Sequence, residues 1–225
     1  MGGKLEDKTM IIRLTNLMKP DEAGKIIAAL SGETHPTPGQ PMLGSDATRR
    51  MGAEMRDAIL KINAFSVAAL PRRMTEFEIH QMDEGMSHAI PIDQAVVGAG
   101  ADNPVRSNLR ISLFLNPPED YGGGELAINV STGVQKLKMA VGDAAIYPAN
   151  QYHVVGQVTR GTRWTAEAVI QSIIREEEQR PALTEIWTVM NWMKTVPPET
   201  AEQLRPSFRA LRRAHSNLDC YWAVV

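Results

Sequence analysis

Between about residues 74 and 174 the chain is a series of short stretches rich in β-branched and aliphatic residues. Residues that favour turns separate them, as in Asn116-Pro117-Pro118, Gly122-Gly123-Gly124 and Gly142-Asp143. The predicted strands cover residues 76–82, 109–115, 125–130, 134–139, 144–147, 153–158 and 163–174. Short strands spaced this evenly favour an antiparallel sandwich or barrel over a parallel α/β sheet.

Helical patterns precede the strands. Pro20-Asp21-Glu22 opens a segment whose apolar residues recur at helical spacing until Gly32, with acidic residues at its start and glycine at its end. Residues 33–46 are rich in Pro, Gly, Thr and Ser and are predicted to form a loop. A second helix is predicted over about 47–62, and the whole zone to about residue 70 is expected to be helical.

The chain becomes helical again from about Glu176. Residues 186–193 and 208–213 have amphipathic patterns, and Pro197-Pro198 predicts a break between them. We therefore expect a mainly β protein with flanking helices. Its first part, residues 1–174, contains the strands and the N-terminal helices, and residues 175–225 form a helical annex packed on it.

Composition limits the kinds of partner. The 24 Lys and Arg residues are balanced by 26 Asp and Glu residues, so the formal net charge is −2. Proteins that bind nucleic acid or membranes normally carry a basic surplus or stripe, and neither partner is expected here. Cys220 is the single cysteine, which excludes an intramolecular disulfide and fits a reducing compartment. The first residues lack the apolar core of a signal peptide, so a cytoplasmic location is expected.

Several motifs of the strand zone occur in a specific order and spacing. They are Asp93, Asn116-Pro117-Pro118-Glu119-Asp120-Tyr121-Gly122-Gly123-Gly124-Glu125-Leu126, Gly142-Asp143, Tyr147-Pro148, His153, Arg163 and Ile170-Gln171-Ser172. Together they resemble the PKHD-type hydroxylases, bacterial relatives of the prolyl 4-hydroxylase branch of the Fe(II)/2-oxoglutarate dioxygenases. The match extends to residues 65–73 and to Gly85-Met86-Ser87. The resemblance implies a double-stranded β-helix, a jelly-roll or cupin-like core.

The resemblance also implies roles for three residues. Ferrous iron in such enzymes is held by two histidines and a carboxylate, which leaves positions open for 2-oxoglutarate and oxygen. Asp93 corresponds to the carboxylate ligand and His153 to the second histidine. Arg163, ten residues after His153, corresponds to the arginine that binds the far carboxylate of 2-oxoglutarate.

The first histidine of the family's His-x-Asp motif is absent, because this chain has Pro91-Ile92-Asp93. A proline side chain cannot bind a metal. Where the family tends to have an Asn-x-Tyr whose tyrosine helps to bind the cosubstrate, this chain has His80-Gln81-Met82, and His88 replaces an aromatic residue of the pocket. Strand alternation places Thr165, Glu167, Val169 and Gln171 on the same face as Arg163, so Glu167 should point inward with it. The residues expected to line the pocket are His80, Met82, His88, Thr165 and Glu167.

This substitution pattern predicts a rebuilt pocket, in one of two forms. In the first, Asp93 and His153 still hold a divalent metal together with a surrogate ligand, Glu167 or His88, with His80 as a further candidate. In the second, no metal binds, and the histidines and Glu167 perform acid–base chemistry on a carboxylate substrate held by Arg163. Structural roles are the alternatives: Arg163 could pair with Glu167, His153 could be a hydrogen-bonded core residue, and Asp93 could cap a turn.

Three functions follow from these alternatives. The leading hypothesis is an Fe(II)/2-oxoglutarate-dependent oxygenase-like enzyme that oxidises, in particular hydroxylates, a small molecule or a side chain. The second is a metal-independent isomerase, lyase or cyclase on the same fold. The third is a non-catalytic relative that binds a ligand through Arg163. A small-molecule substrate is expected in the first two cases, and the C-terminal helices could form the surface of a homodimer.

Overall fold

The computed structural model describes residues 11–33, 44–90, 94–130 and 132–224, and in it two antiparallel sheets pack face to face. The larger sheet contains β1 (Ile12–Leu14), β2 (Pro71–Met74), β3 (Glu78–Met82), β7 (Leu109–Phe114), β11 (Ala144–Pro148) and β14 (Arg163–Ser172). The smaller sheet contains β4 (His88–Ile90), β9 (Leu126–Val130), β10 (Gly133–Leu137) and β12 (His153–Val155). One buried cluster joins side chains of both sheets, including Tyr147, Ile128 and Val155. This is the jelly-roll arrangement that the motifs predicted.

Two short strand pairs complete the β structure. β5 (Val96–Val97) pairs with β6 (Val105–Arg106), and β8 (Tyr121–Gly123) pairs with β13 (Val158–Gly161). A 3₁₀ turn, η1 (Pro118–Asp120), leads into β8. Gly123 and Gly161 both have positive φ, and a side chain at either position would collide with backbone oxygen, so glycine is required for the two strands to approach.

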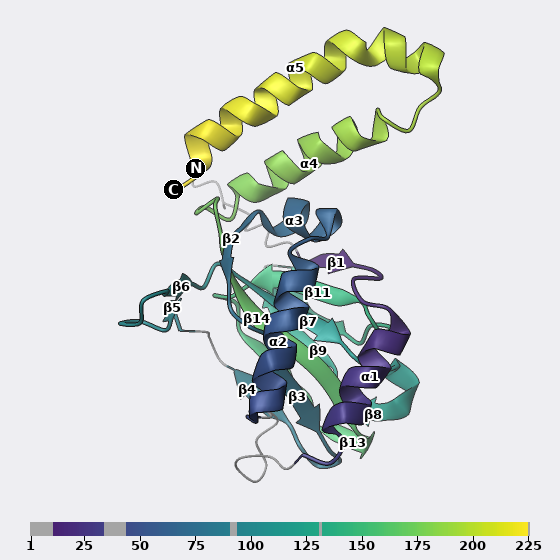
Figure 1. The fold of residues 1–225 in the computed structure, drawn as a ribbon, viewed down its shortest axis with the longest axis vertical. Coiled ribbons are helices and arrows are strands. Elements are labelled where there is room, and N and C mark those ends of the chain that lie inside the picture. Colours follow the sequence, from purple (N-terminus) through teal and green to yellow (C-terminus); the bar gives the residue numbers. More distant parts are fainter. Residues whose placement is uncertain (1–10, 34–43, 91–93, 131, 225) are drawn as a thin grey trace.

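Three helices cover the outer face of the larger sheet (Figure 1). They are α1 (Pro20–Leu30), α2 (Asp46–Ile59) and α3 (Asn63–Ala69). Ser45 caps α2, because its hydroxyl accepts the backbone N–H of Thr48 at 3.1 Å. A second buried cluster joins the apolar faces of these helices to the outward residues of β7 and β14, such as Ile111 and Trp164. The inner face of the larger sheet is therefore left for the pocket.

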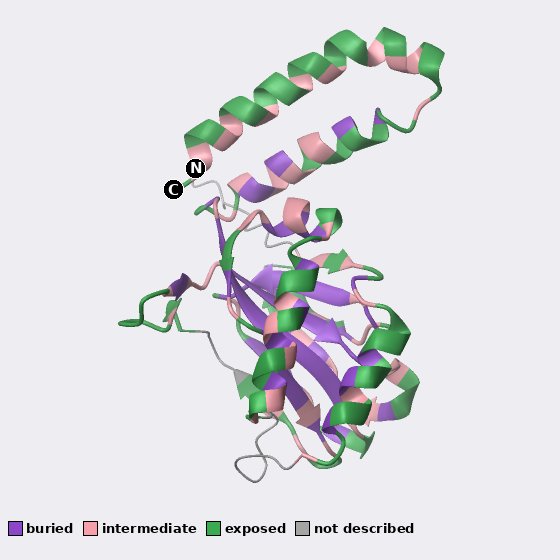
Figure 2. Ribbon diagram, viewed as in Figure 1, coloured by how far each residue is buried: buried purple, intermediate pink, exposed green. Residues whose placement is uncertain are grey.

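The last two helices form a hairpin that projects from the β structure (Figure 1). They are α4 (Gln179–Trp192) and α5 (Pro198–Trp222), and α5 has no buried residue (Figure 2). The chain end returns to the sheet, where the backbone N–H of Val224 donates to the Ile173 carbonyl at 2.8 Å. The break at Pro197-Pro198 is confirmed, and both helices are longer than the predicted blocks 186–193 and 208–213. No helix among the described residues could span a membrane.

The structure corrects several predicted elements. β1 lies in the zone expected to be helical, and it forms an edge strand by pairing with β11. The single strand predicted over 153–158 is two strands, β12 and β13, because the chain changes sheets between Val155 and Val158. The helix predicted over 47–62 is confirmed as α2, but it ends at Ile59. Strands of two to four residues, such as β2 and β5, were missed because so few residues establish no alternation.

Candidate functional site

Strand β14 forms the central wall of the pocket. All ten of its residues are buried, and they alternate between two environments. Trp164, Ala166 and Ala168 belong to the cluster beneath the helices, on the outer face of the sheet. Arg163, Thr165 and Glu167 therefore point towards the smaller sheet, as the alternation predicted.

Arg163 is a buried cation that is only partly satisfied. Its side chain is fully buried, with 0% of its surface exposed. Its Nη1 donates to Thr165 Oγ1 at 2.9 Å and lies 3.8 Å from Met82 Sδ. Nε and Nη2 have no hydrogen-bond partner among the described residues. A buried guanidinium with two unused donors is costly unless an anion pairs with it, so this arrangement can accept an oxyanion.

Tyr121 adds to the same anion site. Its hydroxyl is buried beside the Arg163 guanidinium, and it makes no contact of full hydrogen-bond geometry in the described part of the chain. Burial raises the pKa of Tyr121, and the neighbouring positive charge of Arg163 opposes that rise. The tyrosine is therefore a neutral donor beside a cation. The unused donors of Arg163 match the two oxygens of a carboxylate, and the hydroxyl offers one more, so these residues fit a carboxylate of 2-oxoglutarate.

His153 presents an unused nitrogen to the pocket from the first position of β12. Its Nδ1 lies 2.9 Å from the carbonyl oxygen of Gln151, which fixes the proton on Nδ1 in the neutral ring. Nε2 is buried and has no hydrogen-bond partner among the described residues. The ring packs edge-on against Tyr147, with 5.2 Å between ring centroids. An oriented imidazole with a free Nε2 can bind a metal or transfer a proton.

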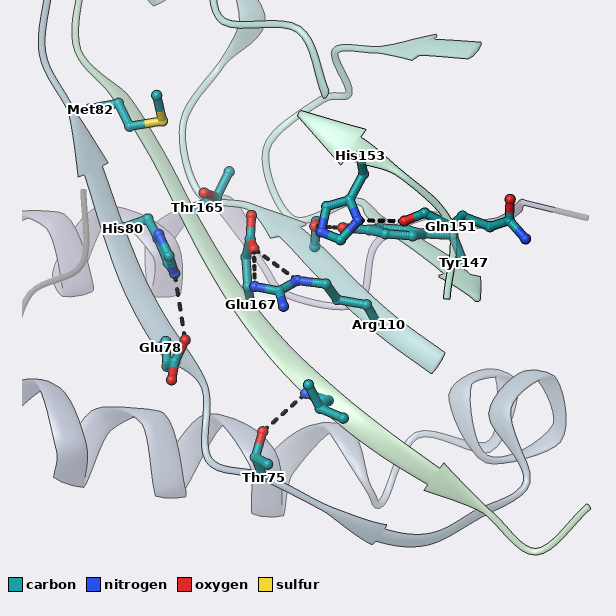
Figure 3. A network of polar contacts seen from close by, with 12 residues as sticks. Thr75, Glu78, His80, Met82, Arg110, Tyr147, Gln151, His153, Thr165 and Glu167 are labelled. Carbon is teal, nitrogen blue, oxygen red and sulfur yellow. Dashed lines mark hydrogen bonds and ion pairs between the residues drawn. The ribbon is translucent and has the colours of Figure 1, made fainter. Parts of the chain in front are cut away.

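Glu167 is held by an arginine that the sequence analysis did not single out. Its Oε2 accepts from Arg110 Nη2 at 2.7 Å and from Nε at 3.1 Å, and both side chains are buried (Figure 3). Burial by itself would raise the pKa of Glu167, but the charge of Arg110 and its hydrogen bonds outweigh burial and keep that pKa well below its ordinary value. The structural alternative, in which Arg163 pairs with Glu167, is wrong, because Glu167 pairs with Arg110.

A signal for Arg110 was present in the sequence. Within the apolar strand 109–115, Arg110 and Ser112 occupy alternate positions that share one face. That face is the inner one, since Ser112 is buried and its hydroxyl lies 3.2 Å from the hydroxyl of Tyr147. Two polar residues at such positions indicate a polar cavity.

His80 and His88 lie near each other, and the charges of Glu167, Arg110 and Arg163 act on both. His80, on β3, is buried, and its Nε2 has no hydrogen-bond partner among the described residues. Burial, followed by the charge of Arg110, lowers the pKa of His80 to about 4. His88, on β4, is half-buried; its ring centroid is 5.9 Å from that of His80, and burial lowers its pKa as well. Both imidazoles are consequently neutral near pH 7.

The described residues do not complete a three-ligand metal site. They contain no group of three His, Cys, Asp or Glu side chains placed to hold a metal ion. Asp93 and Pro91 lie outside the described residues, so the predicted ligand Asp93 has no described position. Glu167 is engaged with Arg110, which leaves His153 as the described side chain best prepared to bind a metal. The donors around Arg163 thus fit a carboxylate of 2-oxoglutarate. The metal-binding side chains among the described residues do not by themselves fit iron.

Comparison with known proteins gives a consistent picture. No family model matches the chain. A PKHD-type hydroxylase of Acaryochloris marina is 35% identical over 169 residues, covering 75% of this chain and 73% of that protein. A PKHD-type hydroxylase of Pseudomonas putida is 34% identical over 183 residues, covering 81% of this chain and 79% of that protein. A PKHD-type hydroxylase of Paracoccus denitrificans is 28% identical over 230 residues, covering 95% of this chain and 99% of that protein.

Solved structures share the fold at low identity. A prolyl-4-hydroxylase of Pseudomonas putida aligns with a TM-score of 0.50 and 15% identity, over 73% of this chain and 94% of that one. HygX from Streptomyces hygroscopicus, solved with nickel and 2-oxoglutarate, aligns with a TM-score of 0.50 and 14% identity, over 75% and 85%. Both support the double-stranded β-helix.

Proposed function

The chain belongs to the PKHD-type hydroxylases, a family of Fe(II)/2-oxoglutarate-dependent dioxygenases, and we propose that it is an oxygenase-like enzyme of this family with a remodelled metal centre. Its substrate is a small molecule or a side chain, which it oxidises, in particular by hydroxylation. The observation that carries the proposal is the fully buried Arg163 with two unused donors.

Arg163 binds the distal carboxylate of 2-oxoglutarate in this proposal. Nε and Nη2 donate to the two carboxylate oxygens, and the Tyr121 hydroxyl donates a further hydrogen bond. Thr165 keeps the guanidinium in place through its bond to Nη1. Because Arg163 is fully buried, these hydrogen bonds are stronger than they would be in bulk water.

The described residues supply only part of the remodelled metal centre. Asp93 and His153 would be its ligands, and His88 is the better surrogate for the third position because Glu167 is committed to Arg110. A metal there would supply the redox chemistry of the reaction. The contribution of the described residues is to fix the His153 ring through Gln151 and to leave its Nε2 free.

A metal-independent acid–base enzyme is the second candidate function, and one observation favours it. The pocket holds an ionised carboxylate, Glu167, together with a neutral imidazole, His80, whose Nε2 is unused among the described residues. The neutral His80 imidazole can take up a proton from a substrate as a base, and the negative charge of Glu167 favours the imidazolium that forms. Arg163 would then hold the carboxylate of the substrate itself.

Anaerobic titration of ferrous iron into chelator-stripped protein, with and without 2-oxoglutarate, tests both candidates by calorimetry. Tight one-to-one iron binding that strengthens with 2-oxoglutarate supports the oxygenase. Binding of 2-oxoglutarate with no iron binding at millimolar metal would reject it in favour of the acid–base enzyme or a binding role. The Arg163→Met variant is the control, since it should remove 2-oxoglutarate binding in either case.

We also propose that the hairpin of α4 and α5 forms the surface of a homodimer. The exposed side chain of Trp192 lies on this hairpin, with 56% of its surface accessible. Light scattering after size-exclusion chromatography, on the wild type and a Trp192→Glu variant, tests this. A monomeric wild type would reject it.

A further inference from the structure

Lys138 contacts the tyrosine that lies beside Arg163. Its Nζ donates a hydrogen bond to the backbone carbonyl oxygen of Tyr121 at 2.7 Å. The same Nζ lies over the Tyr121 ring, 4.1 Å from the ring centroid, where the negative face of the ring attracts a cation. One ammonium group therefore holds both the backbone and the side chain of Tyr121.

The strand that carries Tyr121 has a single partner strand. Among the described strands β8 pairs only with β13, and the register of this pair shifts between Val158 and Arg160. Lys138 follows directly after β10, which belongs to the smaller sheet. Its side chain therefore links β8 to a sheet that β8 does not join through backbone pairing.

Gly124 allows Tyr121 and Arg163 to lie close together. The glycine has a φ of +65°, and a Cβ atom on it would be 3.1 Å from Cδ of Arg163 and 3.2 Å from two ring carbons of Tyr121. Both side chains thus pack against the same backbone atom, and the Tyr121 hydroxyl is buried beside the guanidinium. Because a hydrogen bond weakens steeply with distance and angle, a small shift of the ring would separate this hydroxyl from a carboxylate bound by Arg163.

We propose that Lys138 is a positioning residue of the 2-oxoglutarate site. By holding Tyr121 at its carbonyl oxygen and at its ring, Lys138 keeps the hydroxyl where it can donate to the carboxylate. The inference rests on the proposed function, in which Arg163 and Tyr121 bind the distal carboxylate of 2-oxoglutarate. Lys138 acts through Tyr121 and does not itself touch the ligand.

A direct effect of the lysine charge on the ligand is the competing explanation. A positive charge attracts a dianion at a distance whether or not position 121 carries a hydroxyl group. Positioning, in contrast, has an effect only if there is a hydroxyl to position. The contribution of Lys138 should therefore disappear in a Tyr121→Phe background.

NMR titration of the chelator-stripped full chain with 2-oxoglutarate tests this, using protein labelled with ¹³C at the tyrosine ζ carbons. The resonance of Tyr121 is identified by its absence from the Tyr121→Phe variant, and its shift on titration reports a new hydrogen bond to the hydroxyl. Tyr121→Phe should weaken binding at least about tenfold, the effect of losing one hydrogen bond to a charged group. Lys138→Met should weaken binding at least about fivefold and reduce the shift of the Tyr121 resonance.

The remaining variants separate positioning from charge. Lys138→Met in the Tyr121→Phe background should change affinity by less than about twofold, because no hydroxyl is left to position. Lys138→Arg should restore affinity to within about threefold of the wild type, since a guanidinium can make both contacts. Lys136→Met is the matched control, because Lys136 is an exposed lysine on β10, and its loss should leave affinity and the Tyr121 resonance unchanged.

Equal weakening by Lys138→Met in both backgrounds would overturn the proposal in favour of a direct charge effect. Wild-type affinity in Lys138→Met would overturn it as well, and Lys138→Gln provides a second replacement if thermal unfolding shows that the methionine variant is not folded. Binding that is lost in Arg163→Met but unaffected at Lys138 would reject the positioning role alone. Failure of the wild type to bind 2-oxoglutarate would reject the proposed function, and this role with it.

Discussion

Arg110 and Glu167 form a buried ion pair, with 2.7 Å between Nη2 and Oε2, on adjacent strands of the larger sheet. The two side chains are 7% and 3% exposed, so water cannot compensate either charge. The carboxylate that strand alternation predicted as a surrogate metal ligand is thus neutralised by a guanidinium. Removing one partner would strand the other charge in the protein interior.

We predict that Glu167→Leu and Arg110→Met each lower the free energy of unfolding by about 3–5 kcal/mol. The double variant should lose much less than the sum of the two, because it leaves no unpaired buried charge. Urea denaturation of the four proteins in a double-mutant cycle measures this coupling. As a control, Arg205→Met in the exposed pair with Glu202 should change stability by no more than about 1 kcal/mol. Additive effects at Arg110 and Glu167 would contradict the prediction.

Replacement of Arg163 should weaken the binding of 2-oxoglutarate without lowering the stability of the fold. Arg163→Met removes a buried charge that has two unused donors, so the fold should be as stable as the wild type or more stable. Affinity for 2-oxoglutarate should fall at least about 30-fold, since truncating one partner of a buried charge pair costs about 2–5 kcal/mol. Calorimetry and thermal unfolding measure the two effects. Arg160→Met, at an exposed arginine three residues earlier, should change neither.

The stability of the fold should depend on pH because protonation of the buried histidines is disfavoured in the folded chain. Protonation of His80 is opposed by burial and by Arg110, His88 and Arg163, and favoured by Glu167, and its pKa is lowered from 6.5 to about 4. The unfolded chain therefore binds a proton at higher pH than the folded chain does. Stability should be constant above about pH 6.5 and fall by up to about 3 kcal/mol towards pH 4.

Chemical denaturation between pH 4.5 and 7.5 checks this prediction. The lowered pKa of Glu167 makes a contribution that is lost only below its ordinary value of 4.5, so it does not interfere in this range. His88 acts in the same direction as His80, because its pKa is also lowered. The His80→Gln variant should show a flatter dependence than the wild type. Identical slopes would show that His80 does not resist protonation.

The C-terminal annex should be dispensable for the pocket. Neither buried apolar cluster contains a residue beyond Ile170, and α5 has no buried residue. We predict that a chain ending at Ile174 unfolds cooperatively and binds 2-oxoglutarate within about threefold of the full chain, a difference below 1 kcal/mol. A chain ending at Gly161, which lacks β14, should not fold. Failure of the first chain to fold would mean that the hairpin is part of the core.

The pocket was only partly predictable from the sequence. The direction of Glu167 followed from its even spacing after Arg163, because alternation along a strand is a local property. The motifs assigned His153 and Arg163 to the interior of the β structure, and both side chains are buried there. The partner of Glu167 was not predictable, since Arg110 lies 57 residues earlier in the chain and meets Glu167 only because β7 pairs with β14.

The sequence by itself determined the double-stranded β-helix, the inward side chains of β14 and the presence of a buried arginine at position 163. Each of these depends on spacing within one segment or on a motif read in order. Only the tertiary structure decided which charges meet. It left Nε and Nη2 of Arg163 without a partner among the described residues, joined Arg110 to Glu167, and set Glu78 opposite Glu167. The physical reason is that charge pairing depends on sheet order and register, and both are set by packing between distant segments.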